Sequence, residues 1–103
     1  MIKVTALYPN TPDSSFDINY YINSHCRMLK EIMGAAIKKI EVVEGLAGAA
    51  PGEPPAFVAM GHLYFDSVDA FQTSFGPHVE SIMADVPNYT NIQPTLVISE
   101  VRS

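Results

Sequence analysis

The chain has 103 residues, of which 48% are hydrophobic and only 17% are charged, and its formal net charge at pH 7 is -5. This length suits one domain with one core, so we expect a single domain over residues 1–103. Six Lys and Arg residues cannot form a patch that follows a phosphate backbone, which argues against a nucleic-acid partner. No apolar run approaches the roughly 18 residues that cross a membrane, so we expect no membrane partner.

The first third of the chain predicts a strand followed by a helix. Apolar and polar residues alternate over residues 2–8, which is typical of a strand, and Pro9 ends the pattern. Asp17 is expected to cap a helix that runs to about Met33, with Gly34 as the stop signal. The apolar positions of this helix recur at a spacing of three and four residues and form one stripe: Ile18, Tyr21, Ile22, Leu29, Ile32 and Met33.

Three further strands are predicted. Residues 37–44 are rich in β-branched side chains, and residues 96–101 form the last strand pattern. Residues 57–65 are apolar at nearly every position, which predicts a strand that is covered on both faces. The segment 45–55 holds three Gly and three Pro and is expected to be a flexible connection.

A second helix is predicted between the third and fourth strands. Ser67 caps it and it runs to about Phe75, where Gly76 and Pro77 break it. Pro77 also suits the first position of a further helical turn that reaches about Ala84. A turn-rich segment then leads into the last strand.

The element order βαββαβ predicts an α+β, ferredoxin-like monomer. Two split βαβ units give a four-stranded antiparallel sheet with both helices on one face. The other face is then bare, although the third strand is apolar on both sides. We therefore expect a homodimer in which two identical sheets pair face to face as a dimeric α+β barrel.

His25 is the leading candidate for a catalytic residue. It falls on the apolar stripe of the first helix, where the pattern demands an inward side chain. A desolvated imidazole stays neutral near pH 7 and can accept a proton from a carbon or phenolic acid. The alternative is a core histidine that hydrogen-bonds to a backbone carbonyl or a tyrosine hydroxyl.

His78 is the second catalytic candidate. It follows Gly76 and Pro77 and so falls in the first turn of a helix, where backbone N–H groups keep an imidazole neutral. It also lies near an apolar stripe that includes Phe75, which we expect to contact a substrate. The alternative is a solvent-facing histidine.

His62 and several tyrosines are candidates for substrate binding. His62 shares a strand face with Tyr64, and the opposite face carries two small residues, Ala59 and Gly61, that could leave room for a ligand. The sequence leaves open which face looks at the helices. His62 is structural if it faces a partner sheet.

Tyrosine hydroxyls could orient a carbonyl or a phenolate, or could simply be satisfied core groups. The tyrosines in question are Tyr20, Tyr21, Tyr64 and Tyr89. Asp85 either pins the turn before the last strand or orients a histidine.

No metal or cofactor is expected. The three histidines, at positions 25, 62 and 78, have no short ligand spacing between them, and no glycine-rich phosphate loop is present. Cys26 is the single cysteine, so an internal disulfide is impossible. The N-terminal segment shows no signal-peptide pattern, and we expect a cytoplasmic protein.

Three segments resemble the EthD family, which is named for its link to the degradation of ethyl tert-butyl ether. They are Tyr8-Pro9-Asn10, then Phe16-Asp17-Ile18-Asn19-Tyr20-Tyr21 with His25 four residues later, and Asp85-Val86-Pro87-Asn88-Tyr89-Thr90. The resemblance implies a ferredoxin-like monomer that pairs sheet to sheet. Relatives in the same superfamily include cofactor-free monooxygenases, polyketide cyclases, decarboxylases and lactone isomerases, and a shared fold does not transfer one of these reactions.

Three functions remain open from the sequence. The first is an enzyme that acts on a small hydrophobic molecule between helices and sheet by acid–base chemistry. The second is a non-catalytic ligand carrier or an accessory subunit of an oxidative degradation pathway. The third is a structural dimer with a filled core. A cavity lined by His25 separates the first two from the third.

Overall fold

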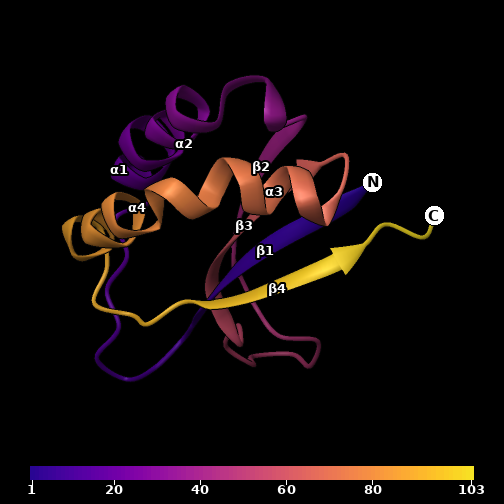
Figure 1. The fold of residues 1–103 in the computed structure, drawn as a ribbon. Helices are drawn as coiled ribbons and strands as arrows, with labels where there is room; N and C mark the ends of the chain where they lie inside the picture. The colour runs from indigo at the N-terminus through magenta and orange to yellow at the C-terminus, as the bar shows by residue number, and fades with distance from the viewer.

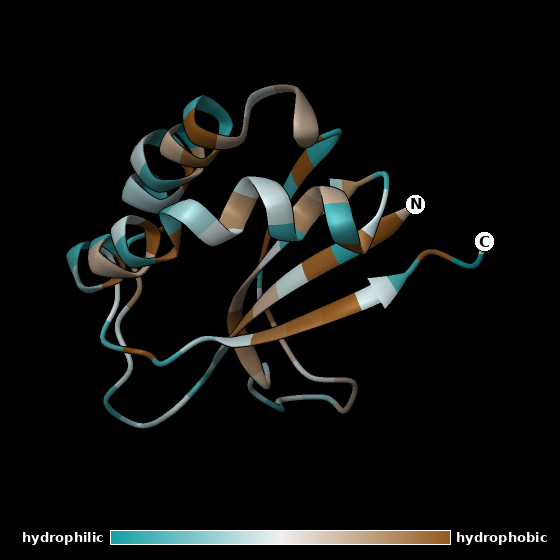
Figure 2. Cartoon of the chain, viewed as in Figure 1, coloured by the Kyte–Doolittle hydropathy of each residue, from teal (hydrophilic) through white to brown (hydrophobic).

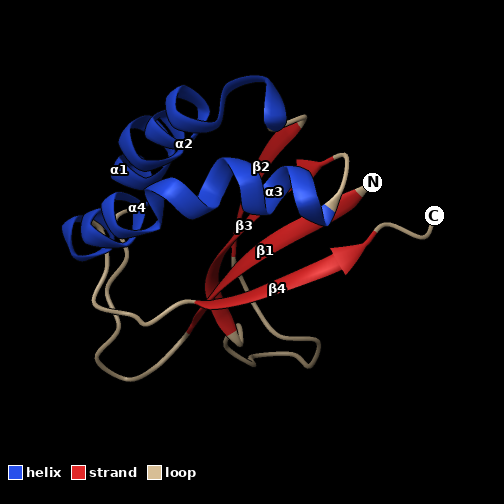
Figure 3. Ribbon diagram, viewed as in Figure 1, coloured by secondary structure: helices blue, strands red, loops and turns tan.

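The computed structural model describes residues 1–103 and shows two layers, a four-stranded sheet and a set of helices that cover one of its faces (Figures 1 and 3). The strands lie in the order β2-β3-β1-β4. All three neighbouring pairs are antiparallel. The expected α+β, ferredoxin-like architecture is therefore confirmed.

The strands match the predicted segments closely. They are β1 (Ile2–Pro9), β2 (Lys39–Glu44), β3 (Phe57–Phe65) and β4 (Thr95–Glu100). β2 begins two residues later than predicted, because Gly34–Ala36 still forms a helical turn at the end of the preceding helix. β4 lies one residue earlier than predicted at each end.

The register of the sheet decides which side chains face the helices. Ala6 pairs with Gly61 across β1 and β3, and Thr5 pairs with His62. Since successive side chains of a strand point to opposite faces, Ala6 and Gly61 lie on the helix side, and Thr5 and His62 lie on the open side. The question that the sequence left open is thus answered, because His62 faces away from the helices.

The first helix begins and ends where it was predicted, but it is not uniformly α-helical. Its three parts are α1 (Ile18–Tyr20), a π-helical turn (Tyr21–His25) and α2 (Cys26–Met33). The Asp17 carboxylate accepts a hydrogen bond from the Tyr20 N–H at 3.0 Å, and Gly34 ends the helix with a φ of 53°.

The π-helical turn corrects one member of the predicted apolar stripe. Tyr21 and His25 are buried, but Ile22 is 46% exposed. A π turn holds more residues than an α turn, so the side chains after its start rotate away from the positions that a 3.6-residue period predicts. Tyr21 and His25 keep the inward face, and Ile22 moves to the surface.

The second helical segment runs longer than its sequence breakers suggest. It consists of α3 (Val68–Phe75), a 3-10 turn (Gly76–His78), α4 (Val79–Asp85) and a last 3-10 turn (Val86–Asn88). The Ser67 hydroxyl caps α3 by accepting from the Ala70 N–H at 3.0 Å. Gly76 and Pro77 tighten the helix into a 3-10 turn and do not end it, so α4 continues beside the first helix (Figure 1). Asp85, the last residue of α4, contacts His25 there.

Two buried clusters hold the layers together. One packs Leu29, Met33 and Phe71 against the sheet residue Phe65. The other is aromatic and gathers Tyr8, Tyr21 and Tyr89 near the start of the first helix. The candidate functional site lies where these two clusters meet.

The sheet has one uncovered face and one weakly covered edge. β4 carries hydrophobic residues along most of its length, as Figure 2 shows. Its side chains Leu96, Val97 and Ile98 are 49%, 41% and 45% exposed. Among the helices, none combines the length and the apolar character that crossing a membrane requires.

Candidate functional site

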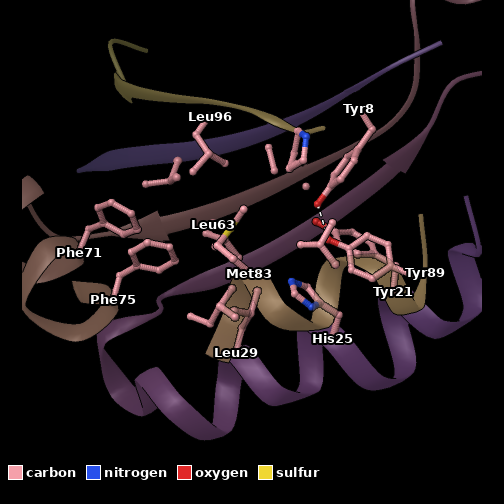
Figure 4. Close-up of a pocket in the computed structure, with 16 residues that line it drawn as sticks. Tyr8, Tyr21, His25, Leu29, Leu63, Phe71, Phe75, Met83, Tyr89 and Leu96 are labelled. Atoms are coloured by element: carbon pink, nitrogen blue, oxygen red, sulfur yellow. Dashed lines mark hydrogen bonds between the residues drawn. The ribbon is translucent and has the colours of Figure 1, made fainter. Parts of the chain in front are cut away.

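A small apolar cavity lies between the helices and the sheet (Figure 4). Sixteen residues line it, thirteen of them hydrophobic, and its volume is about 50 Å³. That volume is well below the roughly 300–1,000 Å³ of pockets that enclose a drug-sized ligand. In this conformation the cavity can therefore hold only a small molecule or the end of a larger one.

The polar groups of the cavity wall are few. They are the imidazole of His25 and the hydroxyl groups of Tyr8, Tyr21 and Tyr89. No Lys, Arg, Asp or Glu belongs to the lining. The wall thus offers an imidazole and three phenols in an otherwise apolar space.

His25 is 4% exposed and projects from the first helix towards the sheet (Figure 4). The last position of the π-helical turn brings it to the inner face. Such turns are rare and are often found at functional sites. Its Nδ1 atom lies 2.9 Å from Oδ2 of Asp85, the last residue of α4.

Asp85 is held from three sides. Its Oδ1 atom accepts hydrogen bonds from the Tyr20 hydroxyl at 2.7 Å and from the Asn88 side-chain amide at 2.9 Å. Its Oδ2 atom is left for His25. The Tyr20 and Asn88 contacts therefore hold the carboxylate in position independently of its contact with the imidazole.

The protonation states of the pair follow from these contacts. Burial lowers the pKa of His25 below 6.5, although the neighbouring Asp85 carboxylate opposes the shift. Burial acts to raise the pKa of Asp85, but the hydrogen bonds from Asn88, His25 and Tyr20 outweigh it and lower that pKa. At neutral pH the pair is thus a neutral imidazole beside an ionised carboxylate.

This charge state assigns the two ring nitrogens of His25. Because a carboxylate only accepts hydrogen bonds, Nδ1 carries the proton and donates it to Asp85. Nε2 then keeps a lone pair and has no hydrogen-bond partner in the protein. Because every fully buried side-chain nitrogen and oxygen does have a partner, Nε2 cannot be fully buried. It is therefore accessible, and the space beside it is the cavity that His25 lines.

The tyrosine hydroxyls form the second polar feature. The hydroxyls of Tyr8 and Tyr89 lie 2.7 Å apart and share a hydrogen bond, and that of Tyr21 lies close to them (Figure 4). Burial raises the pKa of all three side chains, so each phenol is protonated at neutral pH. The Tyr21 ring stacks on the His25 ring, with centroids 5.5 Å apart.

The space over the small residues of β3 is occupied by protein. The sequence suggested that Ala59 and Gly61 leave room for a ligand. A Cβ atom added at Gly61 would overlap the Tyr21 hydroxyl. Gly61 therefore makes room for Tyr21 first, and the cavity begins beside that side chain.

Four of the seven residues predicted for the site line the cavity. These are His25, Tyr21, Phe75 and Tyr89. His62 and Tyr64 lie on β3 with side chains on the open face of the sheet, where the Thr5 hydroxyl contacts His62 Nδ1 at 3.2 Å. His78 is exposed on the 3-10 turn after α3 and does not belong to the lining.

Two residues of the site went unassigned in the sequence. Tyr8 was named in the first strand and in the Tyr8-Pro9-Asn10 segment but was given no role in a site, although the alternation places it on the same face as Val4 and Ala6. Asn88 holds Asp85 from three residues downstream, and the adjacent Pro87 masked it as an ordinary turn residue. No group of three or more His, Cys, Asp or Glu side chains comes together in a way that could hold a metal ion.

The sequence and the fold of the chain were compared with those of known proteins. The EthD domain profile matches residues 11–93. The chain is similar to an EthD-like protein of Ralstonia eutropha JMP134, with 44% identity and a TM-score of 0.92 over 96% of this chain and 89% of that one. It is also 26% identical to an uncharacterized 11.0 kDa protein of Rhodococcus erythropolis from the thcB-thcC intergenic region, over 97% of this chain and 94% of that protein.

A more distant solved structure shows the fold alone. It is a dimeric protein of unknown function with a ferredoxin-like fold from Bacteroides fragilis, 19% identical, with a TM-score of 0.50 over 97% of this chain and 95% of that one. The profile match spans most of the chain and includes His25, Asp85 and Tyr89. The chain belongs to the EthD family.

Proposed function

We propose that this protein binds a small hydrophobic molecule in the cavity between the helices and the sheet, and that His25 acts there as a general base without a cofactor. The observation that carries the proposal is the pairing of His25 Nδ1 with Asp85 while Nε2 is open to an apolar cavity. A neutral imidazole held in one tautomer beside a carboxylate is suited to take a proton from a bound molecule.

The proton transfer that the geometry supports is simple. A C–H next to a carbonyl, or a phenolic O–H, gives its proton to Nε2, and the electron pair of the broken bond moves to the oxygen of the ligand. The imidazolium that forms is stabilised by Asp85 across the 2.9 Å contact. The same proton can return to another carbon of the ligand, which shifts the double bond and completes an isomerisation without a cofactor.

A non-catalytic carrier is the second candidate. Its support is the lining itself, which is hydrophobic at thirteen of sixteen residues and would hold an apolar ligand whether or not a proton moves. A carrier has no need of a fixed imidazole tautomer. The two candidates are therefore separated by whether His25 moves protons.

The experiment that tests the catalytic proposal is hydrogen–deuterium exchange of a small ketone, butanone, followed by NMR in D2O. Exchange at the carbon next to the carbonyl reports proton abstraction directly, whatever the natural reaction is. We expect the protein to accelerate it and His25→Gln to reduce the acceleration by about 10²-fold. His78→Gln is the matched comparison and is expected to retain the acceleration, because His78 lies outside the cavity.

Two outcomes would count against the catalytic proposal. Acceleration that survives in His25→Gln would place the base elsewhere. If the wild-type protein binds butanone without accelerating exchange, the carrier is the better description.

We further propose that two copies of the chain pair through their open sheet faces. That face carries partly buried apolar side chains, including Leu7, Val43, Val58 and Met60. Val97 of β4, which pairs with Thr5 and is 41% exposed, extends the same apolar surface to the sheet edge. Light scattering at micromolar concentration is expected to give the mass of a dimer, and a monomer mass would contradict the pairing.

A further inference from the structure

The hydroxyls of Tyr8, Tyr21 and Tyr89 leave one proton that they do not use among themselves. Each neutral phenol carries one proton. The single hydrogen bond between Tyr8 and Tyr89 uses one of the two protons of that pair. Tyr21 also donates a side-chain hydrogen bond to Tyr8, so two of the three hydroxyl protons are used, and the proton of Tyr8 has no acceptor among the three hydroxyls.

His25 has the opposite property, a hydrogen-bond acceptor for which the protein supplies no donor. Its Nε2 atom is an acceptor without a donor, whereas Nδ1 is already bound to Asp85. The two features are neighbours, because the ring centroid of His25 lies 5.5 Å from that of Tyr21 and 4.8 Å from that of Tyr89. One wall of the cavity thus combines one unused hydroxyl donor with one unused acceptor.

The absence of charged side chains from the cavity lining further limits the kinds of ligand that can bind. A carboxylate or phosphate taken into this apolar space would lose its hydration without a cation to replace it, since no Lys or Arg lines the cavity. A hydrocarbon would leave the remaining hydroxyl proton and Nε2 of His25 without a hydrogen-bond partner. Both kinds of ligand are disfavoured, and a neutral ligand with an oxygen atom is favoured.

We propose that the hydroxyls of Tyr8, Tyr21 and Tyr89 form a donor site for one oxygen of the ligand, opposite the Nε2 acceptor of His25. The site selects a neutral molecule whose acidic hydrogen lies either on an oxygen atom, as in a phenol, or on the carbon beside a carbonyl group, as in an enolisable ketone. The hydroxyl or acidic C–H faces Nε2, and the oxygen accepts from the tyrosines. This inference rests on the proposed function, because it requires a ligand in the cavity.

Phenol, toluene and benzoate form a suitable set of probes. Phenol and toluene have nearly the same shape and differ in the oxygen, and benzoate adds a negative charge. Dissociation constants are measured by NMR titration for the wild-type protein, for Tyr21→Phe and for the double variant Tyr8→Phe/Tyr89→Phe. Tyr64→Phe is the matched control, because Tyr64 lies on the open face of the sheet.

We expect the ratio of the phenol to the toluene dissociation constant to rise about 3- to 10-fold in both tyrosine variants and to stay unchanged in Tyr64→Phe. Dividing by the toluene value removes changes in cavity shape that affect both probes. Benzoate is expected to bind more weakly than phenol to the wild-type protein. If the double variant does not fold, as judged by circular dichroism, Tyr21→Phe decides the question.

The outcomes separate the two levels of the proposal. If phenol and toluene bind but the ratio does not move in the tyrosine variants, the donor site is wrong and cavity binding stands. If benzoate binds as tightly as phenol, the selection for a neutral ligand is wrong. If neither phenol nor toluene binds the wild-type protein, the proposal that the cavity binds a ligand is wrong, and the proposed donor site is wrong as well.

Discussion

His25 Nδ1 and Asp85 Oδ2 lie 2.9 Å apart, although the two residues are sixty positions apart in the chain. The contact joins the first helix to the end of α4 and leaves the other nitrogen of the imidazole in the cavity. Aromatic rings of Tyr21 and Tyr89 flank the histidine. This pair is the centre of the proposed function.

Asp85→Asn is expected to lower the pKa of His25 further. The Asp85 carboxylate favours the charged imidazolium and so opposes the effect of burial, and an amide does not replace its charge. NMR titration of the His25 ring protons measures the change. Asp69→Asn, at an exposed position of α3, is the control and should leave the titration of His25 unchanged. A higher pKa for His25 in Asp85→Asn would contradict the proposed pair.

The stability of the protein is expected to fall in acid in two stages. The pKa of His25 is lowered by burial, so below pH 6.5 the unfolded chain binds a proton that the folded chain resists, and stability decreases until the folded pKa is reached. The pKa of Asp85 is also lowered, so its contribution is present above pH 3.8 and is lost as the pH falls towards the folded pKa.

Denaturant unfolding at a series of pH values tests the first stage. The wild-type protein should lose more stability than His25→Gln between pH 6.5 and the lower pKa of the folded state. His62→Gln is the comparison, because burial also lowers the pKa of His62 and its contribution must be separated. Equal pH dependence in the wild type and His25→Gln would show that His25 does not resist protonation.

Gly61→Ala is expected to destabilise the protein by about 1–3 kcal/mol, because the new methyl group overlaps the Tyr21 hydroxyl. Gly76→Ala is the matched control, since a Cβ at Gly76 meets nothing within 4 Å and its backbone is helical. The free energy of unfolding measures both. Combining Gly61→Ala with Tyr21→Phe should recover part of the loss, and full tolerance of Gly61→Ala alone would mean that Tyr21 does not occupy this space.

Met60→Asp is expected to produce a folded monomer. Met60 lies on the open sheet face, where the proposed dimer would bury it, and an unpaired carboxylate opposes such burial. Val68→Asp is the control, because Val68 is exposed at the start of α3, outside that face, and should leave the mass unchanged. Light scattering and circular dichroism are measured together. A dimer that persists in Met60→Asp would move the interface elsewhere.

The fold could be predicted from local patterns in the sequence. The alternation in β1, the apolar run of β3 and the caps Asp17 and Ser67 each act within a few residues, and the structure places these elements where they were expected. The π-helical turn at Tyr21–His25 could not be foreseen, because its hydrogen bonds depend on how the aromatic side chains pack against the sheet.

The candidate site could be predicted only in part. The inward position of His25 follows from the helical period, and that is a local property. Its pairing with Asp85 depends on the path of the second helical segment through Gly76 and Pro77, where the sequence predicted a break followed by a further helical turn to about Ala84 but not the direction of that turn. His78 was proposed from its place in a helical first turn, and His62 and Tyr64 from a strand face whose orientation the sequence left open. The surface position of the 3-10 turn and the sheet register separate all three from His25.

The protonation of His25 itself is the most direct test of the proposed function. NMR of protein labelled with ¹⁵N in its histidine rings reports the tautomer and the pKa in one titration. The geometry predicts a neutral ring protonated on Nδ1, an unprotonated Nε2 and a pKa below 6.5. A ring protonated on Nε2, or a pKa above 6.5, would contradict the assignment of His25 as a base that faces the cavity.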